Sequence, residues 1–469
     1  MEQSNRLQLH NFSSSSHINW SKYETKSYLH FDNRVKIEHV KKSIQDPEWI
    51  KKHAFFPFIH FEIKFEKYVV KDLPNINQLK KVALPRDLKE KKNKIRKIYY
   101  SSHIDSHIYK YYGDILNLAY NDYAVTNEID SNVLAYRNNK KGLNNIDFAH
   151  EVFDFVFNQK KAIIISLDFT SFFDKINHKK LKKNIKDVLK CDELPKDIYK
   201  IYKSITQFSY VNKSDTDEFL IQKYGYELLK QKKKDKSLSR IMNTKEYREF
   251  KKTNKLYKNK KPFGIPQGSG MSAVCSNIHL IHFDQELKKW ANSKNALYRR
   301  YCDDLILVIP ENEDILERVK FLKDEVIHIV EKYRDDGLII QPEKTEIRFY
   351  ENGLIKGENG EKSKLDYLGF VTDGEAVKIR EKSLFKYHTR AYRKARVCRN
   401  ITLKTGEKFE RGKLYKIYTH LGFKYKKHGN FISYAEKAHG LMKTLPVKSL
   451  IKNQIKRHWY RIHKILNDK

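Results

Sequence analysis

Two adjacent aspartates, Asp303 and Asp304, stand between a basic stretch that ends at Arg300 and an apolar run, Leu305 to Ile309. The run is typical of a buried strand, so the acids are predicted to lie at a hairpin turn. Carboxylates crowded at a turn repel one another and attract a hard divalent cation. Aspartate is also a common turn residue, so this pair alone does not distinguish a metal site from a plain turn.

A second acid pair in the same chain serves as a comparison. Asp335-Asp336-Gly337 follows a segment with helical periodicity, from about Glu313 to Arg334, and has glycine at the capping position. Such a pair is expected at a helix end, where no metal is needed. The interpretation of Asp303 and Asp304 therefore depends on other motifs.

The first of these motifs lies upstream. The run Ala162 to Leu167 predicts a buried strand, and Asp168 stands at its end. Three carboxylates from two neighbouring strands could hold two Mg²⁺ ions about 3.5 to 4 Å apart, a spacing that serves the attacking and leaving oxygens of nucleotidyl transfer. The alternative for Asp168 is a helix cap after a strand, which suits Asp174 better.

The second motif is the loop Gly264 to Gly270, which precedes a helical stretch from about Ser272 to Trp290. Its proline and three glycines allow a backbone to lie close to a flat partner, where Gln267 can form a hydrogen bond. A simple loop-to-helix turn would also use glycine and proline.

Together these motifs resemble the reverse transcriptase family. The resemblance covers roughly Arg137 to Phe370 and rests on five segments in the order of motifs A to E of that family. These are the aspartate strand, the Pro-Gln-Gly loop, the Tyr-Cys-Asp-Asp hairpin, residues 341–346 and the segment Tyr367 to Phe370. The resemblance implies an α+β, right-hand polymerase fold with fingers, palm and α-helical thumb.

The resemblance also implies roles for individual residues. Asp168, Asp303 and Asp304, with Phe169 beside them, would bind two Mg²⁺ ions, for which Mn²⁺ could substitute. Lys344 would face the pyrophosphate. Gln267 and Gly268 would line the nascent base pair, and the hairpin of Tyr367, Leu368 and Gly369 would grip the primer end.

Phe173 bears on the choice of sugar. It stands five residues after Asp168, where family members carry an aromatic gate against a ribose 2′-hydroxyl. RNA-templated RNA polymerases usually place an acid there and glycine before the two catalytic acids, where this chain has Cys302. The chain is therefore expected to prefer deoxynucleotides. The alternative for Phe173 is core packing beside Phe172.

Cations upstream of motif A are candidates for triphosphate contacts. Arg137 and Lys141 fall where the fingers of reverse transcriptases present positive charge to the incoming nucleotide. The planar guanidinium of arginine suits phosphate. A surface cation cluster is the alternative, because the whole chain is so basic.

The formal charge of the chain is +36 on 469 residues, which implies a polyanionic partner. The N-terminus lacks a signal-peptide core and no apolar run approaches a membrane span, so we expect a cytoplasmic protein with no membrane partner. The four cysteines are scattered without metal-binding spacing, which argues against zinc and disulfides.

Four regions are predicted: an N-terminal extension (1–90), fingers (91–160), a palm (161–375) and a helical thumb with the C-terminal region (376–469). From about Leu88 to Asn158 the pattern is mainly helical, with Ile104, Ile108, Tyr111, Tyr112 and Ile115 at helical spacing. A lysine-rich insertion near 205–260 is either a solvated helical hairpin or a nucleic-acid contact, and we favour the contact. In the thumb, a helix from about Glu381 to Cys398 would pack one face and track phosphates with the other. The basic face consists of Lys386, Arg390, Arg393 and Lys394.

The subgroup is narrowed by what the chain lacks. Retron enzymes carry Asn-Ala-x-x-His and Val-Thr-Gly signatures, but the corresponding stretches here are Asn145 to His150 and Val371-Thr372-Asp373-Gly374, which do not match. Group II intron enzymes usually have a nuclease tail with paired Cys and His residues, and this chain lacks such pairs. The chain most resembles the bacterial unknown-group reverse transcriptases, many of which act in antiphage defence. That resemblance implies an RNA template, often a dedicated noncoding RNA, with dNTPs as substrates, a DNA product, and a homo-oligomer or a companion defence protein. Two alternatives stay open: a template-independent or protein-primed DNA polymerase, and a non-catalytic RNA-binding scaffold.

Overall fold

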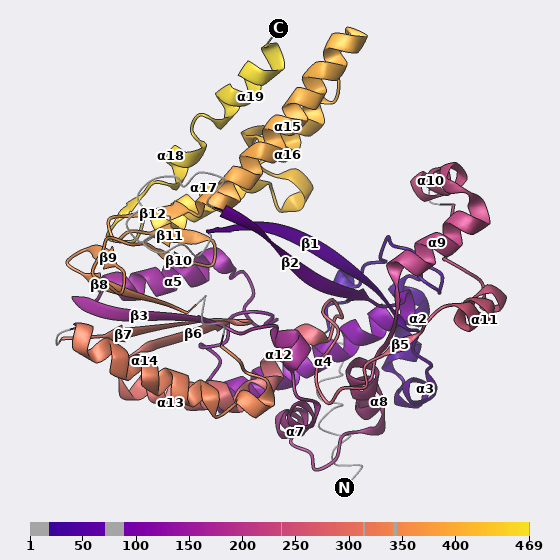
Figure 1. Cartoon of the computed structure of the whole chain (residues 1–469), viewed down its shortest axis with the longest axis horizontal. Coiled ribbons are helices and arrows are strands. Elements are labelled where there is room, and N and C mark those ends of the chain that lie inside the picture. Colours follow the sequence, from indigo (N-terminus) through magenta and orange to yellow (C-terminus); the bar gives the residue numbers. More distant parts are fainter. Residues whose placement is uncertain (1–17, 71–88, 236, 313–314, 341–344, 469) are drawn as a thin grey trace.

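The computed structural model describes the chain except for residues 1–17, 71–88, 236, 313–314, 341–344 and 469 (Figure 1). Lys344 and most of the motif around it therefore lie outside the described residues. The described part combines many helices with three β-sheets, which makes it an α+β protein.

The central sheet is built around β3 (Lys161–Asp168), with the order β6-β7-β3-β8-β9. The other strands are β6 (Leu297–Tyr301), β7 (Asp304–Pro310), β8 (Glu346–Glu351) and β9 (Leu354–Lys356). β3 pairs antiparallel with both β7 and β8. Because both faces of this sheet are covered, β3 is a nearly continuous apolar run, as the sequence predicted.

Successive side chains of β3 enter two different cores. Ile163 and Ile165 pack in the core formed with α13 (Ile281–Ser293) and α14 (Ile315–Glu331), whereas Ile164 packs in the core formed with α5 (Asn145–Phe157). This alternation follows from the two-residue period of a strand. Figure 1 shows α13 and α14 on one face of the sheet and α5 on the other.

A second sheet has the order β2-β1-β4-β5. Its strands are β1 (Phe58–Val70), β2 (Lys89–Tyr100), β4 (Ser209–Asn212) and β5 (Tyr257–Lys258). The sequence analysis expected mainly helix after about Leu88, and for residues 89–100 that prediction is wrong, because β2 pairs with β1 along its whole length, from Ile59–Tyr100 to Val70–Lys89. The sheet also joins the N-terminal extension to the lysine-rich insertion, two regions that the sequence analysis treated separately.

The helices beside this sheet form the largest core with one face of the central sheet. α4 (His103–Thr126) runs through its middle and buries Ile108, Tyr111, Tyr112 and Ile115, which the sequence placed on one helical face. Around it lie α2 (Ile37–Gln45), α3 (Pro47–Lys52), α7 (His178–Leu189), α8 (Lys196–Thr206) and α12 (Ser272–His279).

The insertion carries a small core of its own. Its helices are α9 (Lys213–Tyr224), α10 (Tyr226–Lys234) and α11 (Thr244–Thr253). Leu220, Leu229 and Phe250 from these helices pack against Phe31 of the N-terminal segment and Ile59 of β1. The insertion is thus anchored on the second sheet.

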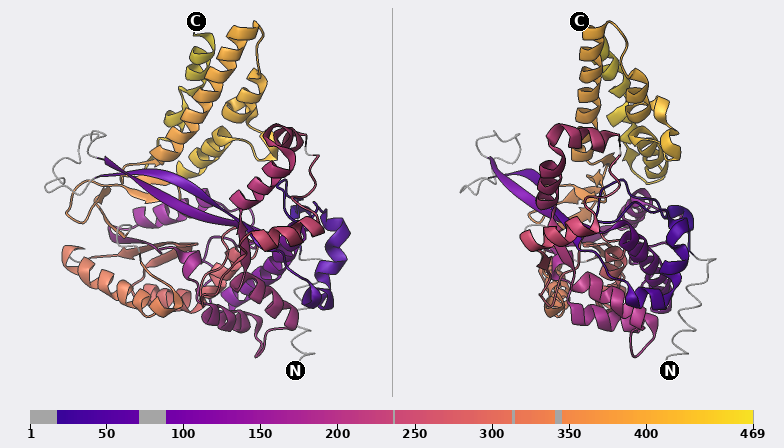
Figure 2. Two further views of the ribbon diagram at one scale, coloured as in Figure 1. Left: turned by 45° about the vertical axis from the view of Figure 1, so that its right-hand side comes forward. Right: turned by 90° about the vertical axis from the view of Figure 1, so that its right-hand side faces the viewer.

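The C-terminal region consists of a small sheet and a helical lobe. The sheet has the order β10-β11-β12-β13, with β10 (Leu365–Tyr367), β11 (Phe370–Thr372), β12 (Ala376–Ile379) and β13 (Lys448–Ser449). The lobe contains α15 (Glu381–Thr405), α16 (Arg411–Tyr418), α17 (Phe431–Met442), α18 (Ile451–Ile455) and α19 (His458–Asn467). In both views of Figure 2, α15 and α19 project from the rest of the molecule.

The predicted packing face of the first thumb helix is confirmed. Ala391, Ala395 and Cys398 of α15 are fully buried against Ile462 and Leu466 of α19. Small side chains on α15 allow the two helices to approach closely.

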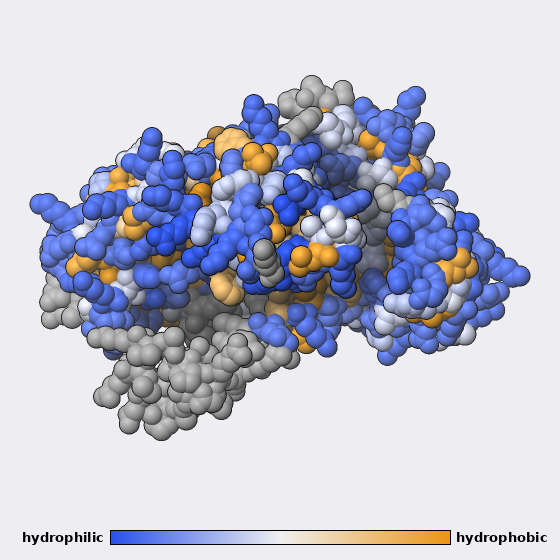
Figure 3. Space-filling model, turned by 90° about the horizontal axis from the view of Figure 1, so that it is seen from above, coloured by the Kyte–Doolittle hydropathy of each residue, from blue (hydrophilic) through white to orange (hydrophobic). Residues whose placement is uncertain are grey.

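The exterior fits the composition of the chain. The face seen in Figure 3 is mainly hydrophilic, with hydrophobic residues in small scattered groups. None of the helices in the described part of the chain combines the length and the hydrophobicity that a membrane-spanning helix needs.

Candidate active site

The two adjacent aspartates occupy different positions in the β6–β7 hairpin. Tyr301 pairs with Asp304, so the turn consists of Cys302 and Asp303, and Asp304 is the first residue of β7. The sequence analysis placed both acids in the turn. Cys302 adopts a φ of 61°, which two-residue hairpin turns of the primed types require. Its side chain is buried, and burial raises the pKa of the Cys302 thiol to about 12.

Strand register brings the third aspartate to the same end of the sheet. Asp168, the last residue of β3, stands directly opposite Asp304 in the antiparallel β3–β7 pair. Asp168 is buried, Asp303 is half-buried and Asp304 is exposed. The backbone of Phe169 continues from Asp168 and bridges to Ile340, while its ring is buried against Phe172 and Phe283.

The chemistry of these residues suits a hard divalent cation, because all three supply carboxylate oxygens. In the described part of the chain, however, no three acidic, histidine or cysteine side chains are gathered closely enough to hold a metal ion. The backbone puts Asp168 and Asp304 opposite each other in neighbouring strands. Metal binding by these residues stays a prediction.

The second acid pair behaves as the sequence predicted. After α14 ends at Glu331, a 3-10 turn (Arg334–Asp336) ends in Gly337 with a φ of 97°. Asp336 forms an ion pair with Lys180 at 3.2 Å. This pair closes a helix, whereas Asp303 and Asp304 stand in a hairpin beside Asp168.

A fully buried arginine, Arg300, forms hydrogen bonds that stabilise the β6–β7 hairpin. Arg300 on β6 contacts both carboxylate oxygens of Asp284 on α13, at 2.7 Å from Nε and 2.6 Å from Nη2. Its Nη1 donates to the Cys302 carbonyl at 2.9 Å and to Asn277 Oδ1 at 3.2 Å. Burial alone would lower the pKa of Arg300, but the charge of Asp284 and its hydrogen bonds outweigh burial and raise it.

Sequence reasoning missed this pair. Arg300 looked like part of a basic surface stretch, although Tyr298, Arg300 and Cys302 share one face by strand alternation. Tyr298 also donates to Asp284, at 2.6 Å, so the acid receives hydrogen bonds from two residues of β6. Because Arg300 donates to the carbonyl within the turn, it fixes the backbone that carries Asp303.

The Pro-Gln-Gly loop lies against β2. The Gln267 carbonyl accepts a hydrogen bond from the Tyr99 N–H at 3.0 Å. Gly268 has a φ of 119°, and a Cβ added there would lie 2.5 Å from the Tyr99 carbonyl oxygen. The close approach that requires glycine is therefore made by protein backbone, and the contact with a nascent base pair stays a prediction.

The same loop is tied to the segment after Asp168. Ile265 N–H donates to the Phe173 carbonyl at 3.0 Å, and Gly264 N–H donates to the Ile176 carbonyl at 2.9 Å. Phe173, in the short helix α6 (Phe172–Lys175), is half-buried with its ring 5.7 Å from that of Phe172. Only part of the Phe173 ring is thus used for core packing.

The predicted triphosphate contact of Arg137 is not available in this structure. Its side chain is fully buried, forms an ion pair with Asp130, donates to Asn121 and lies 4.9 Å from the centre of the Tyr120 ring. In all of these contacts the guanidinium binds groups of the protein itself, so Arg137 stabilises the loop in which it lies. Lys141 is exposed.

Two other cations lie near the segment that contains Phe173. Lys97 on β2 and Lys261, just before the Pro-Gln-Gly loop, both act electrostatically on Asp174, the residue after Phe173. Lys97 could not be recognised from the sequence, because its position depends on the pairing of β2 with β1.

The hairpin predicted to grip the primer is β10–β11. Tyr367 pairs with Phe370 across a two-residue turn, where Leu368 has a φ of 45° and Gly369 a φ of 96°. The Leu368 carbonyl accepts from Asn145 Nδ2 at 2.9 Å. The Tyr367 ring is buried in the core, so it can support the turn but does not face solvent.

The basic face of α15 is divided. Lys386, Arg390 and Arg393 are exposed, whereas Lys394 is half-buried and forms an ion pair with Glu410. The prediction of four solvent-facing cations is therefore corrected to three, because Lys394 is neutralised within the protein.

The comparison with known protein families bears on this site. The reverse transcriptase (RNA-dependent DNA polymerase) family matches residues 88–372, which is more than half of the chain and includes all three aspartates. The chain belongs to the reverse transcriptase family. This family consists of nucleotidyltransferases that generally use divalent metals. The expected α+β, right-hand polymerase fold is confirmed.

Solved structures similar to this reverse transcriptase include yeast telomerases. Apo telomerase from Candida tropicalis is 15% identical, with 80% of this chain and 57% of that chain covered and a TM-score of 0.44. The same telomerase truncated from its C-terminal domain is 15% identical, with 64% and 56% covered and a TM-score of 0.38. Telomerase from Candida albicans in complex with a TWJ fragment of telomeric RNA is 13% identical, with 92% and 68% covered and a TM-score of 0.39.

The chain thus spans 56% to 57% of the length of the two Candida tropicalis telomerase structures. No curated protein matches it in sequence.

Proposed function

We propose that this reverse transcriptase extends a primer with deoxynucleotides opposite an RNA template. The observation that carries the proposal is the pairing of Asp168 with Asp304 next to the turn residue Asp303, within a chain of the reverse transcriptase family. The strand register of the β3–β7 pair brings these acids together, although more than a hundred positions separate β3 from β7 in the sequence.

Asp168, Asp303 and Asp304 would hold two Mg²⁺ ions, or Mn²⁺ in their place, with the Phe169 backbone beside them. When bound, the ions would supply charge stabilisation at the attacking and leaving oxygens. The protein's part is to bring three like charges together, which costs free energy until a cation neutralises them. Arg300 contributes by fixing the turn that carries Asp303.

Other residues would bind the substrates. Gln267 and Gly268 would line the nascent base pair, and Lys97, Lys141 and Lys261 would attract the triphosphate. Lys344, outside the described residues, would face the pyrophosphate. The turn of Leu368 and Gly369, supported by Tyr367, would contact the primer end, while Lys386, Arg390 and Arg393 would follow the duplex backbone.

Phe173 would select the sugar by volume. Replacing Phe173 by alanine or valine should admit ribonucleotides, because the exposed part of the ring would no longer occupy the space of a 2′-hydroxyl. The measurement is the ratio of deoxy- to ribonucleotide incorporation on one template.

Phe172→Ala is the matched control. Phe172 is buried, so its truncation should cost about 3 to 5 kcal/mol of stability and leave the ratio unchanged. An unchanged ratio in the Phe173 variants would remove this residue from the gate.

We further propose a setting in bacterial antiphage defence, in the cytoplasm, with a dedicated noncoding RNA as template. The support is the resemblance of the motifs to the unknown-group reverse transcriptases, and the formal charge of +36 fits an RNA partner. A homo-oligomer or a companion defence protein belongs to the same proposal. Primer extension on an RNA template, measured beside a reaction without template, distinguishes RNA-directed synthesis from template-independent or protein-primed synthesis. A non-catalytic scaffold would give no extension in either reaction.

A further inference from the structure

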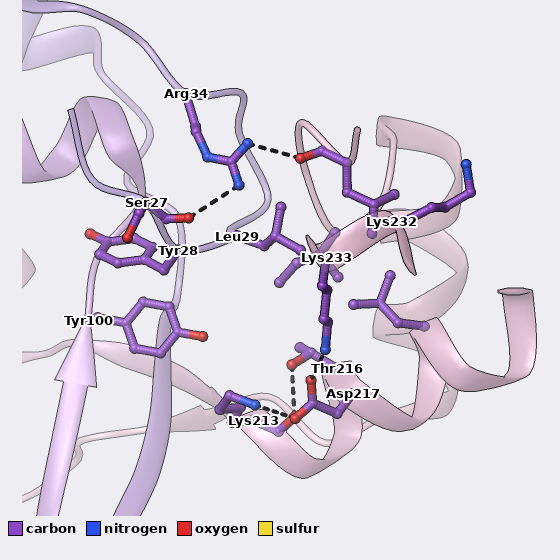
Figure 4. Close-up of a pocket in the computed structure, with 13 residues that line it drawn as sticks. Ser27, Tyr28, Leu29, Arg34, Tyr100, Lys213, Thr216, Asp217, Lys232 and Lys233 are labelled. Atoms are coloured by element: carbon purple, nitrogen blue, oxygen red, sulfur yellow. Dashed lines mark hydrogen bonds and ion pairs between the residues drawn. The ribbon is translucent and has the colours of Figure 1, made fainter. Parts of the chain in front are cut away.

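A cavity lies between the N-terminal segment and the insertion helices, beside the end of β2 at Tyr100 (Figure 4). Its volume is about 310 Å³, at the lower end of the range of small-ligand pockets. It is lined by residues from the segment 27–34, the end of β2, α9 and α10. None of the residues assigned to polymerisation lines it.

One wall of the cavity is aromatic and held rigidly. The Tyr28 and Tyr100 rings lie 4.7 Å apart, and Tyr28 stacks on His103 at 5.2 Å. The Tyr28 hydroxyl donates to the Ser101 carbonyl at 2.9 Å, which fixes the ring. The two rings are tilted by 59° to each other, and Leu29 also lines this side, so the wall is aromatic and largely apolar (Figure 4).

A second wall carries positive charge, while Leu220, Leu238 and Ile241 line the remainder. Lys213 and Lys233 both contact Asp217, from opposite sides of its carboxylate (Figure 4). Arg34 donates to the carbonyls of Leu238 at 2.9 Å and Ser27 at 3.2 Å, which fixes the guanidinium without neutralising its charge. With Lys232, four basic side chains line the cavity against one carboxylate.

We infer that this cavity binds one nucleotide, with the base on the tyrosine wall and the phosphate beside Arg34 and Lys233. Flat aromatic surfaces stack on bases, and fixed cations attract phosphate. A cavity that attracted phosphate alone would not need the aromatic wall.

The source of the nucleotide is assigned to single-stranded RNA. Lysines cluster on α10 next to the cavity, at positions 230 and 232–234, and can follow a chain that leaves the site in either direction. A free mononucleotide would gain nothing from them. The inference goes beyond the proposed polymerisation, because an RNA held here is anchored between the N-terminal segment and the insertion helices rather than copied.

Binding can be measured without polymerisation, using the full chain with Asp303→Asn, no dNTPs, and a labelled, unstructured RNA oligonucleotide. Tyr100→Leu should weaken RNA binding by about 5- to 100-fold through loss of stacking, whereas Tyr100→Phe, which keeps the ring, should bind like the parent. Lys233→Glu should weaken binding more than Lys234→Glu, a control with the same charge change on the same helix that does not line the cavity.

Two further measurements make the result decisive. A 4-thiouridine RNA should cross-link to peptides that contain Tyr28 or Tyr100 in the parent protein, which does not depend on the folding of any variant. Adenosine monophosphate serves as the second probe. If Tyr100→Leu weakens only its binding, the cavity takes a free nucleotide and the assignment to RNA is wrong. Unchanged binding of both probes with no cross-link at this wall would overturn the inference, whatever the polymerase assays show.

Discussion

Replacing Asp303 by asparagine is expected to reduce nucleotide incorporation by on the order of a thousandfold or more while the protein stays folded. Asparagine keeps the shape of the turn residue and removes the charge that would bind metal. In the absence of metal the variant should unfold at the same or a higher temperature, because one of three neighbouring negative charges is gone. Single-turnover incorporation and thermal unfolding measure the two effects.

Asp335→Asn is the matched control for this variant. Asp335 also belongs to an Asp-Asp pair, but its side chain is exposed at the end of a helix rather than in the hairpin. We expect this control to incorporate nucleotides at the normal rate. Near-normal incorporation by Asp303→Asn would show that Asp303 is not a metal ligand of the reaction.

The second large effect is expected at Arg300. Arg300→Met should lower the free energy of unfolding by about 3 to 5 kcal/mol, because Asp284 would be left charged and buried without its partner. Incorporation should fall as well, since the Cys302 carbonyl loses the donor that fixes the turn. Chemical denaturation and single-turnover incorporation would measure these changes.

A double variant separates the effect of an unpaired buried charge on stability from the effect of Arg300 on the position of the hairpin turn. In Arg300→Met with Asp284→Leu no buried charge is left alone, so much of the stability should return. Incorporation should stay low, because the turn is still not held. Arg348→Met on β8, which breaks a more exposed pair with Glu346, should cost at most about 1 kcal/mol. If the double variant regains full activity, Arg300 contributes to folding alone and does not position the hairpin.

Local patterns were sufficient to predict several elements. The continuous apolar run of β3 and the small-residue face of α15 each follow from one strand or helix buried against its neighbours. The strand at 89–100 could not be predicted in this way. Its sequence is rich in lysine, and its conformation depends on pairing with β1, which is a tertiary interaction.

In the candidate active site, too, some residues could be predicted from local motifs and others depend on tertiary contacts. The three aspartates could be named from their motifs, but the register that sets Asp168 opposite Asp304 depends on strand pairing. Arg300 and Asp284 are unremarkable in sequence, and only packing reveals that both are fully buried. The burial of Arg137 could not be predicted for the same reason, because its ion pair with Asp130 depends on how the loop packs.

The most direct test of the central claim is primer extension on defined RNA templates, with a reaction lacking template and the Asp303→Asn protein run in parallel. We expect DNA whose sequence is complementary to the RNA, made only when RNA, dNTPs and a divalent cation are all present, and absent with Asp303→Asn. DNA of template-independent sequence, equal synthesis without RNA, or undiminished synthesis by Asp303→Asn would contradict the central claim.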